Sequence, residues 1–263
     1  MFSVTGRAQK VKQPRGGYIN PKQFAVTEGE NRRFEIDWSN FDGNVHASIV
    51  GMVVDYFTRY MLGEELLKAF EVPCTGAVLA EKYFGYEGAS KEAYGYLTGI
   101  KQIDDESIVN ACKLVTFDVW CRNPGNAAKS KRAIETNPDA STLMYISDMI
   151  VRCFYFLRKY GPIVRSGFTF EGGYTNTVSR GDGDYLTKDT LWDVKVSKNP
   201  PTNKHTLQLL MYWIMGQHTG EKEFKNIDKL GIFNPKLNLI YTLNVTDIPS
   251  DTIKTVEEEV ICY

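Results

Sequence analysis

Asp184 and Asp193 are the two residues of this sequence whose types and spacing are best suited to chemistry. They lie on either side of Lys188-Asp189, the most polar point of the segment 183–196, which has the pattern of a β-hairpin. In a hairpin that is symmetric about this turn, Asp184 faces Asp193 directly. Two carboxylates opposed in this way have β-carbons about 5 Å apart, so they repel each other. A divalent cation between them, or protonation of one acid, would relieve the repulsion.

The alternating pattern of the second predicted strand decides which side chains accompany the acids. Successive residues of a strand point to opposite faces, so Trp192 and Val194 are expected on the buried face. Asp193 and Lys195 then share the other face, and the same register sets Asp182 opposite Lys195. An ordinary ion pair between Asp182 and Lys195, on the charged face of an amphipathic hairpin, is the alternative to a metal site.

Two predicted helices supply further polar residues at regular spacing. In the helix expected over about 204–216, after the Pro200-Pro201 break, Lys204, Gln208 and Tyr212 recur every four residues and form one polar stripe. This helix follows the hairpin directly and can lie against its open face or its edge. In an earlier helix, expected over about 47–68, Asp55 and Arg59 lie one turn apart and can form an ordinary intrahelical ion pair.

The remaining pattern predicts one α/β domain, residues 31–263, that carries a helical insert. Helical periodicity covers about 77–160, and segments of β type follow it. A short helix is expected over 249–259. The expected strands are 163–164, 168–170, 185–186, 191–196, 238–245 and 260–263.

Residues 1–30 are expected to form a basic N-terminal arm. Every charged residue before Glu28 is basic, and Gly16-Gly17 interrupts any regular element. The arm is either a solvated tail or a segment that contacts phosphates. The basic residues are Arg7, Lys10, Lys12, Arg15 and Lys22.

The composition excludes several classes of protein. The 263 residues include 31 basic and 32 acidic side chains, so a uniformly cationic coat protein is not expected, although a local basic groove is compatible with this balance. The five cysteines and three histidines have no zinc-binding spacing, and the cysteines are expected to be buried thiols. A metal would therefore be held by carboxylates, which favours Mg²⁺ or Mn²⁺. With no apolar run of about 18 residues and no leader, the chain is expected to be cytoplasmic and not to associate with membranes.

Four short motifs resemble those of the PD-(D/E)XK nuclease superfamily, specifically its RecB-like branch. That branch has G-x-x-x-H, G-x-x-D, D-x-K and Q-x-x-x-Y in this order. Here the corresponding segments are Gly51 to Asp55, Gly181 to Asp184, Asp193-Val194-Lys195 and Gln208 to Tyr212. Asp55 departs from the pattern, because the RecB-like branch usually has histidine there. Other branches have a helical acid at this place, and His46 is a competing candidate.

The resemblance covers about 47–70 and 163–216, and it implies a restriction-endonuclease-like core with a central mixed β-sheet flanked by helices. It also implies that Asp55, Asp184, Asp193 and the carbonyl group of Val194 hold one or two Mg²⁺ or Mn²⁺ ions. Lys195 would orient or activate the attacking water and offset the charge of the transition state. Gln208 and Tyr212 would position Lys195 or contact the nucleic-acid backbone. The flanking candidates for phosphate contacts are Arg180, Lys198 and Lys204.

The expected function is that of a metal-dependent, exonuclease-like deoxyribonuclease, which hydrolyses phosphodiester bonds of single- or double-stranded DNA. The alternative is a nucleic-acid-binding or assembly protein on the same fold that has lost its catalytic activity. An interaction protein without a role in nucleic-acid metabolism is a third option, with which the 15 tyrosines and 14 phenylalanines are compatible.

Overall fold

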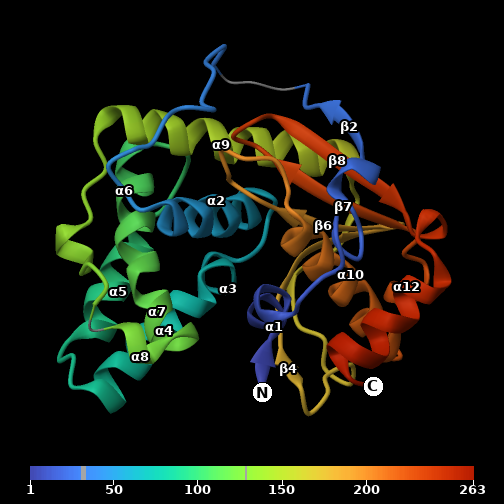
Figure 1. The fold of residues 1–263 in the computed structure, drawn as a ribbon. Coiled ribbons are helices and arrows are strands. Elements are labelled where there is room, and N and C mark those ends of the chain that lie inside the picture. The colour runs from blue at the N-terminus through green and yellow to red at the C-terminus, as the bar shows by residue number, and fades with distance from the viewer. Residues whose placement is uncertain (31–33, 128) are drawn as a thin grey trace. The chain divides into compact units, whose positions relative to one another are not determined.

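The computed structural model describes residues 1–30, 34–127 and 129–263, which form two compact units. The first unit combines residues 1–30 with 156–263, and the second unit comprises 31–155. This division differs from the predicted one, in which an arm preceded a single domain, and the predicted boundary at residue 31 lies outside the described residues. Both termini belong to the first unit (Figure 1).

The first unit contains a six-stranded β-sheet with the strand order β2-β8-β7-β6-β5-β3 (Figure 1). Strands β6 and β7 run parallel, and the other neighbouring pairs are antiparallel. The prediction of an α/β fold with a central mixed sheet is therefore confirmed. The strands are β2 (Ala25–Glu28), β3 (Ile163–Phe168), β5 (Gly183–Thr187), β6 (Thr190–Val194), β7 (Lys229–Asn234) and β8 (Leu239–Asn244).

The β5–β6 hairpin has the register predicted from its polar turn. Tyr185 pairs with Trp192, and Leu186 pairs with Leu191. Continuing this register sets Asp184 opposite Asp193. Strand β6 ends at Val194, two residues earlier than expected.

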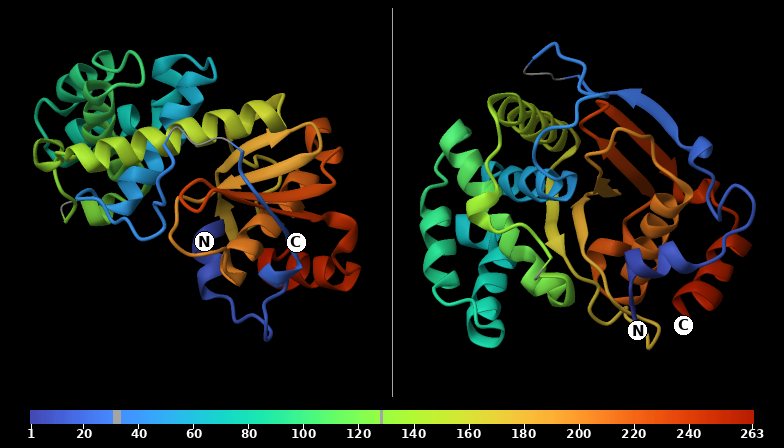
Figure 2. Two further views of the ribbon diagram at one scale, coloured as in Figure 1. Left: turned by 90° about the horizontal axis from the view of Figure 1, so that it is seen from above. Right: turned by 60° about the vertical axis from the view of Figure 1, so that its left-hand side comes forward.

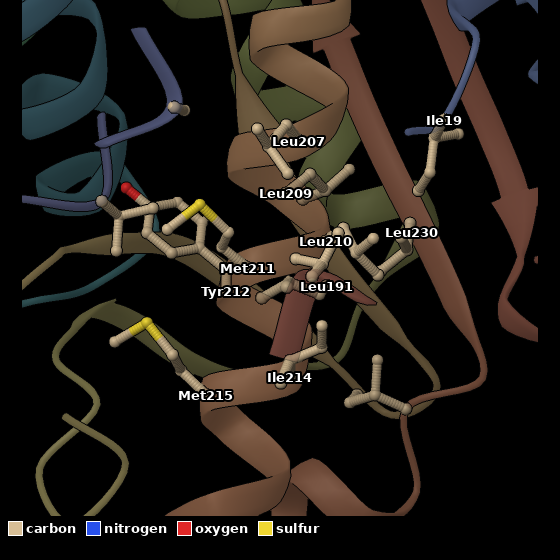
Figure 3. Close-up of a cluster of buried hydrophobic side chains, with 14 of the residues drawn as sticks. Ile19, Leu191, Leu207, Leu209, Leu210, Met211, Tyr212, Ile214, Met215 and Leu230 are labelled. Atoms are coloured by element: carbon tan, nitrogen blue, oxygen red, sulfur yellow. The ribbon is translucent and has the colours of Figure 1, made fainter. Parts of the chain in front are cut away.

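Residues of the first unit cover both faces of the sheet. On one face, α10 (Asn203–His218) packs apolar side chains against Leu191 and Leu230, as Figure 3 shows. On the other face, the Phe156 and Tyr160 rings, at the end of α9 (Ala140–Tyr160), lie 4.8 and 5.2 Å from the Trp192 ring, measured between centroids. The sheet is thus flanked by helices, and the face that carries Asp193 lies under α10 instead of being open to solvent.

Residues 1–30 are a packed part of the first unit and not the solvated tail that was one of the two alternatives; a contact of this segment with phosphates stays a prediction. Strand β1 (Phe2–Ser3) pairs in parallel with β4 (Val178–Arg180), and α1 (Val4–Lys10) buries Val4 and Ala8. Arg7 donates a hydrogen bond from Nε to the carbonyl oxygen of Val260 at 2.8 Å. A 3₁₀-helix (Pro21–Gln23) leads into the edge strand β2. The basic residues alternate with apolar residues that pack, and this packing determines the structure of the segment.

The C-terminus is helical, which corrects the predicted strand 260–263. Helix α12 (Ser250–Thr255) continues into a π-helical segment, Val256–Ile261. Val256, Val260 and Ile261 are all buried. Spacings of four and five residues place side chains on one face of a helix, whereas a strand would require a period of two.

The short helix α11 (Lys222–Lys225) lies between α10 and β7.

The described residues of the second unit form helices and no strand (Figure 2). The helix expected over 47–68 is divided into α2 (Ala47–Met61) and α3 (Leu66–Ala69), with Gly63 between them at a φ angle of +98°. Few residues other than glycine adopt this conformation, so Gly63 ends α2. The other helices are α4 (Glu71–Phe84), α5 (Ala89–Thr98), α6 (Asp105–Leu114), α7 (Asp118–Arg122), α8 (Pro124–Ala127), the 3₁₀-helices Val115–Phe117 and Ala133–Glu135, and the first part of α9.

Helix α9 is, among the described residues, the one helix whose length and apolar composition would allow it to cross a membrane. However, 67% of its apolar stretch is buried inside the protein. Such burial is typical of a core helix in a soluble protein, whose apolar side chains contact other side chains instead of lipid.

Candidate active site

Asp184 and Asp193 lie on the face of the hairpin that α10 covers. Leu186 and Leu191 belong to the same buried cluster as the apolar side chains of α10. Because side chains alternate along a strand, Asp184 shares the face of Leu186, and Asp193 shares that of Leu191. Asp193 is only 2% exposed. The two acids are thus held on one covered face, as the predicted register requires.

Lys195 is the charge partner of Asp193. Its Nζ donates a hydrogen bond to Asp193 Oδ1 at 2.8 Å. Burial opposes the charge on Lys195, but the nearby Asp193 and Asp184 carboxylates outweigh this effect and keep the pKa of Lys195 above its usual value. Lys195 is therefore a protonated ammonium group beside both acids. The alternative partner suggested by the sequence was Asp182, whereas the observed ion pair is with Asp193.

The other hairpin acid is held by the backbone. The backbone N–H of Val194 donates a hydrogen bond to Asp184 Oδ2 at 2.7 Å. This bond joins the backbone of β6 to the Asp184 side chain of β5. It holds one carboxylate oxygen of Asp184 beside the Asp193-Val194-Lys195 segment. A backbone donor of this kind orients the carboxylate without neutralising its charge.

Gln208 and Tyr212 lie together on α10, as their spacing predicted. Gln208 Nε2 donates a hydrogen bond to the Tyr212 hydroxyl group at 2.9 Å, and both side chains are buried. Burial raises the pKa of Tyr212, the Lys195 charge opposes the rise, and Asp193 and Asp184 add to it. The Tyr212 hydroxyl group is thus a neutral group within electrostatic range of the three charged residues.

Gly181, the first residue of the G-x-x-D motif, allows the chain to approach Tyr212 closely. A β-carbon at this position would lie 2.7 Å from a methyl group of Val4 and 3.2 Å from the Tyr212 ring. The Gly181 carbonyl oxygen accepts a hydrogen bond from the Tyr174 hydroxyl group at 2.9 Å. The glycine of this motif therefore has a packing role next to the site.

His205 is a member of the site that the sequence pattern did not indicate. Its Nδ1 accepts a hydrogen bond from the backbone N–H of Thr202 at 3.1 Å, which caps the start of α10. Burial and the charge of Lys195 lower the pKa of His205, and Asp193 opposes that shift. The sequence could have indicated this role, because His205 is the third residue of the helix. A side-chain acceptor at this position can accept a hydrogen bond from the backbone N–H of the residue that precedes the helix.

Asn234, at the end of β7, is a second residue that was not predicted. Its Nδ2 donates a hydrogen bond to the carbonyl oxygen of Ser197 at 2.7 Å, and its Oδ1 accepts one from the backbone N–H of Lys236 at 3.1 Å. Asn234 thereby holds the loop that follows Lys195. The available signal was an asparagine directly before Pro235, which is typical of a turn.

The hairpin acids fit a hard cation. Asp193 Oδ2 is buried and receives no hydrogen bond from any of the described residues. A carboxylate oxygen left in this way costs at least about 1–3 kcal/mol, and a cation would satisfy it. No group of three or more His, Cys, Asp and Glu side chains suited to a metal occurs among the described residues. Mg²⁺ is commonly held by only one or two carboxylates, with water and substrate phosphates completing its shell, so two acids match the number of protein ligands that this cation usually takes.

Asp55 and His46 belong to the second unit and have well-defined contacts there. The Arg59 guanidinium group donates two hydrogen bonds to Asp55, one of them from Nε to Oδ1 at 3.0 Å. This is the intrahelical pair foreseen as the simpler alternative. His46 caps α2 by accepting a hydrogen bond at Nδ1 from the backbone N–H of Ser48 at 3.2 Å. A metal-binding role of either residue stays a prediction.

The three predicted phosphate contacts are exposed side chains of the first unit. Arg180 ends β4, Lys198 follows β6 in the loop held by Asn234, and Lys204 lies in the first turn of α10. Their exposure is compatible with binding to a polyanion, and their role stays a prediction.

Comparison of the chain with protein-family models, curated proteins and solved structures finds no match.

Proposed function

We propose that this chain is a metal-dependent nuclease that hydrolyses phosphodiester bonds of DNA. One observation supports the proposal above all others: Asp193 presents a buried carboxylate oxygen with no hydrogen-bond donor among the described residues, next to Asp184 and to the ammonium group of Lys195. The ion pair between Lys195 and Asp193 leaves this oxygen unsatisfied, whereas a cation and a phosphate would complete the group of charges. The fold proposed for it is the restriction-endonuclease-like core.

The residues have distinct roles in this proposal. Asp184, Asp193 and the carbonyl group of Val194 would hold Mg²⁺ or Mn²⁺. The bound ion would polarise the scissile phosphate and make a water molecule more acidic. Lys195 is oriented by its hydrogen bond to Asp193 and offsets the negative charge that develops on the phosphate oxygens. Gln208 and Tyr212 exclude bulk water beside Lys195 and limit its movement.

Metal binding is tested by calorimetric titration of the apo-protein with Mn²⁺. We expect heat of binding in the parent protein and little or none in the Asp193→Asn and Asp184→Asn variants. Asp182→Asn is the matched control, because Asp182 is a neighbouring but exposed acid. Equal heats in the parent and in Asp193→Asn would refute the metal site.

Cleavage is tested separately with single- and double-stranded DNA in Mg²⁺ and in EDTA. We expect products in Mg²⁺ only, and a loss of at least about a hundredfold in rate for Asp193→Asn. Mn²⁺ binding without cleavage of any substrate would instead favour the alternative, a nucleic-acid-binding protein that has lost its catalytic activity.

A further inference from the structure

The second unit contains two adjoining cavities of about 860 and 260 Å³. Both are lined entirely by residues of this unit, and they share part of their lining. We refer to the two together as the basic–aromatic groove. The shared lining residues are Thr116, Val119, Ser130 and Lys131.

Cationic side chains gather along the basic–aromatic groove. Arg122 and Lys129 line the larger cavity, Arg132 lines the smaller one, and Lys131 lines both; all four are exposed. Within the described part of the chain, neither Lys129 nor Lys131 takes part in an ion pair. Their charges are therefore available to an anionic ligand.

The two acids of the groove, Asp118 and Glu135, cancel only part of the charge of the four basic side chains. Asp118 is buried, accepts a hydrogen bond from the Tyr56 hydroxyl group at 2.5 Å, and forms an ion pair with Arg122, whose Nε lies 3.1 Å from Asp118 Oδ1. The carboxylate of Glu135 accepts a hydrogen bond from the backbone N–H of Arg132 at 2.9 Å. The groove thus keeps a positive surface, which suits a ligand with several negative charges.

Aromatic rings line the smaller cavity. The Phe84 and Trp120 ring centroids lie 5.1 Å apart, and the Phe84 side chain is 48% exposed. Tyr86 lies 6.4 Å from Trp120, and the Arg132 guanidinium group lies 4.8 Å from the Tyr86 centroid. Aromatic faces beside guanidinium and ammonium groups are the combination on which unpaired bases stack while their phosphates are neutralised.

We infer that the basic–aromatic groove binds single-stranded nucleic acid. Phosphates lie against Lys129 and Lys131, and one base enters the smaller cavity and stacks on Phe84 and Trp120. A duplex does not fit this arrangement, because its bases are stacked on each other and cannot reach an aromatic cavity. The inference concerns the second unit and is independent of whether the hairpin acids cleave DNA.

Binding of the full chain to a labelled oligothymidylate of about 15 nucleotides is measured by fluorescence anisotropy in EDTA, where metal-dependent cleavage is absent. The Lys129→Ala/Lys131→Ala double variant should bind at least about tenfold more weakly. Its slope of log affinity against log salt concentration should be shallower by about 1.4, because each single-strand phosphate contact contributes about 0.7. The matched control is Lys91→Ala/Lys101→Ala, which removes two exposed lysines of the same unit that do not line the groove, and it should bind like the parent.

A second pair of variants tests stacking. Phe84→Leu should weaken binding at least about fivefold, and Phe84→Tyr, which keeps a ring, should restore it. The inference would be overturned if the Lys129→Ala/Lys131→Ala variant bound the oligonucleotide as tightly as the parent and the control variant do. So would duplex DNA that binds as tightly as the single strand, or a polyglutamate that displaces the oligonucleotide at equal charge. Loss of cleavage in Asp193→Asn with unchanged oligonucleotide binding would support the groove as a separate site.

Discussion

Lys195 and Asp193 show how two charged residues can serve both stability and chemistry. The ammonium group pairs with one carboxylate oxygen, while the other oxygen lacks a donor among the described residues. A purely structural ion pair would satisfy both oxygens, since a buried charged atom without a partner is destabilising. The asymmetry is the residue-scale reason to expect a cation.

Replacing Lys195 by Met is expected to abolish cleavage while leaving Mn²⁺ binding largely intact. The variant leaves Asp193 Oδ1 without its donor, so the apo-protein should lose about 1–3 kcal/mol of unfolding free energy. The pKa of Lys195 is raised, so its contribution to stability is complete below the usual lysine pKa and is lost only at higher pH. The difference between parent and variant in the free energy of unfolding, measured with urea, should therefore be constant from about pH 6 to about pH 9.

Lys188→Met, at the exposed turn, is the control and should leave cleavage, Mn²⁺ binding and stability unchanged. Loss of the heat of Mn²⁺ binding in Lys195→Met would assign Lys195 a structural role.

Most of the site could be predicted from spacing alone, because strand and helix periods are fixed by geometry. The hairpin turn set Asp184 opposite Asp193, and the interval of four residues joined Gln208 to Tyr212. His205 could not be predicted in this way. It lies three residues from Gln208, and only the packing of α10 on the sheet brings it within electrostatic range of Lys195.

The start of α10 depends on His205, and this dependence should vary with pH. The folded protein lowers the pKa of His205, so the unfolded chain binds the proton more readily. Stability should therefore fall as the pH drops through and below the usual histidine range near about 6.5. His205→Gln keeps an acceptor for the Thr202 N–H but does not titrate, so it should lose less stability between about pH 8 and about pH 5.

His205→Ala separates capping from titration. It removes the acceptor and does not titrate, so it should be less stable than His205→Gln by about 1 kcal/mol at both pH values. Urea unfolding of the three proteins at the two pH values measures both effects. A steeper pH dependence in His205→Gln than in the parent would contradict the assigned environment of His205.

The close approach of β7 to Trp192 makes Gly231 a sensitive position. A β-carbon at Gly231 would lie 2.2 Å from the Trp192 indole ring, which is itself enclosed by Phe156 and Tyr160. Gly231→Ala should therefore reduce the free energy of unfolding by about 1–3 kcal/mol. Gly95→Ala is the matched control, because Gly95 lies inside α5 with open space at its β-carbon and should gain up to about 1 kcal/mol. Equal thermal stability of the two variants would refute the packing argument.

The elements that were missed or misassigned share a physical cause. β1, β2, β4 and β7 were not predicted, and the first three are short strands whose pairing partner lies far away in the chain. Their hydrogen bonds depend on tertiary contacts, which local propensity does not contain. The segment 260–263 was misassigned because Val and Ile favour strands, whereas burial at helical spacing decided its structure.

At the scale of the whole molecule, the first unit joins the two ends of the chain. Residues 1–30 and 156–263 form one compact body, and the side chain of Arg7 bonds to the carbonyl groups of Glu259 and Val260. Sequence reasoning assigned the first segment by its charges, because a count of basic residues is visible in the sequence and burial is not. Val4, Ile19 and Phe24 are nevertheless buried, so apolar contacts and not charges determine its place.

This difference leads to a prediction that separates charge from packing in the N-terminal segment. Val4 contacts the sheet-covering cluster and is fully buried, so Val4→Ala should lower the free energy of unfolding by about 2 kcal/mol through lost apolar burial and the cavity left behind. The Lys12→Ala/Arg15→Ala double variant removes two exposed charges and should leave that free energy within about 0.5 kcal/mol of the parent value. Both are measured by urea unfolding of the full chain. If the charge variant were the less stable of the two, the segment would owe its position to electrostatic contacts. If Val4→Ala is the less stable, apolar packing holds the segment in place. Truncation of the N-terminus would then disrupt the unit that carries Asp184 and Asp193, and not merely a tail that precedes it.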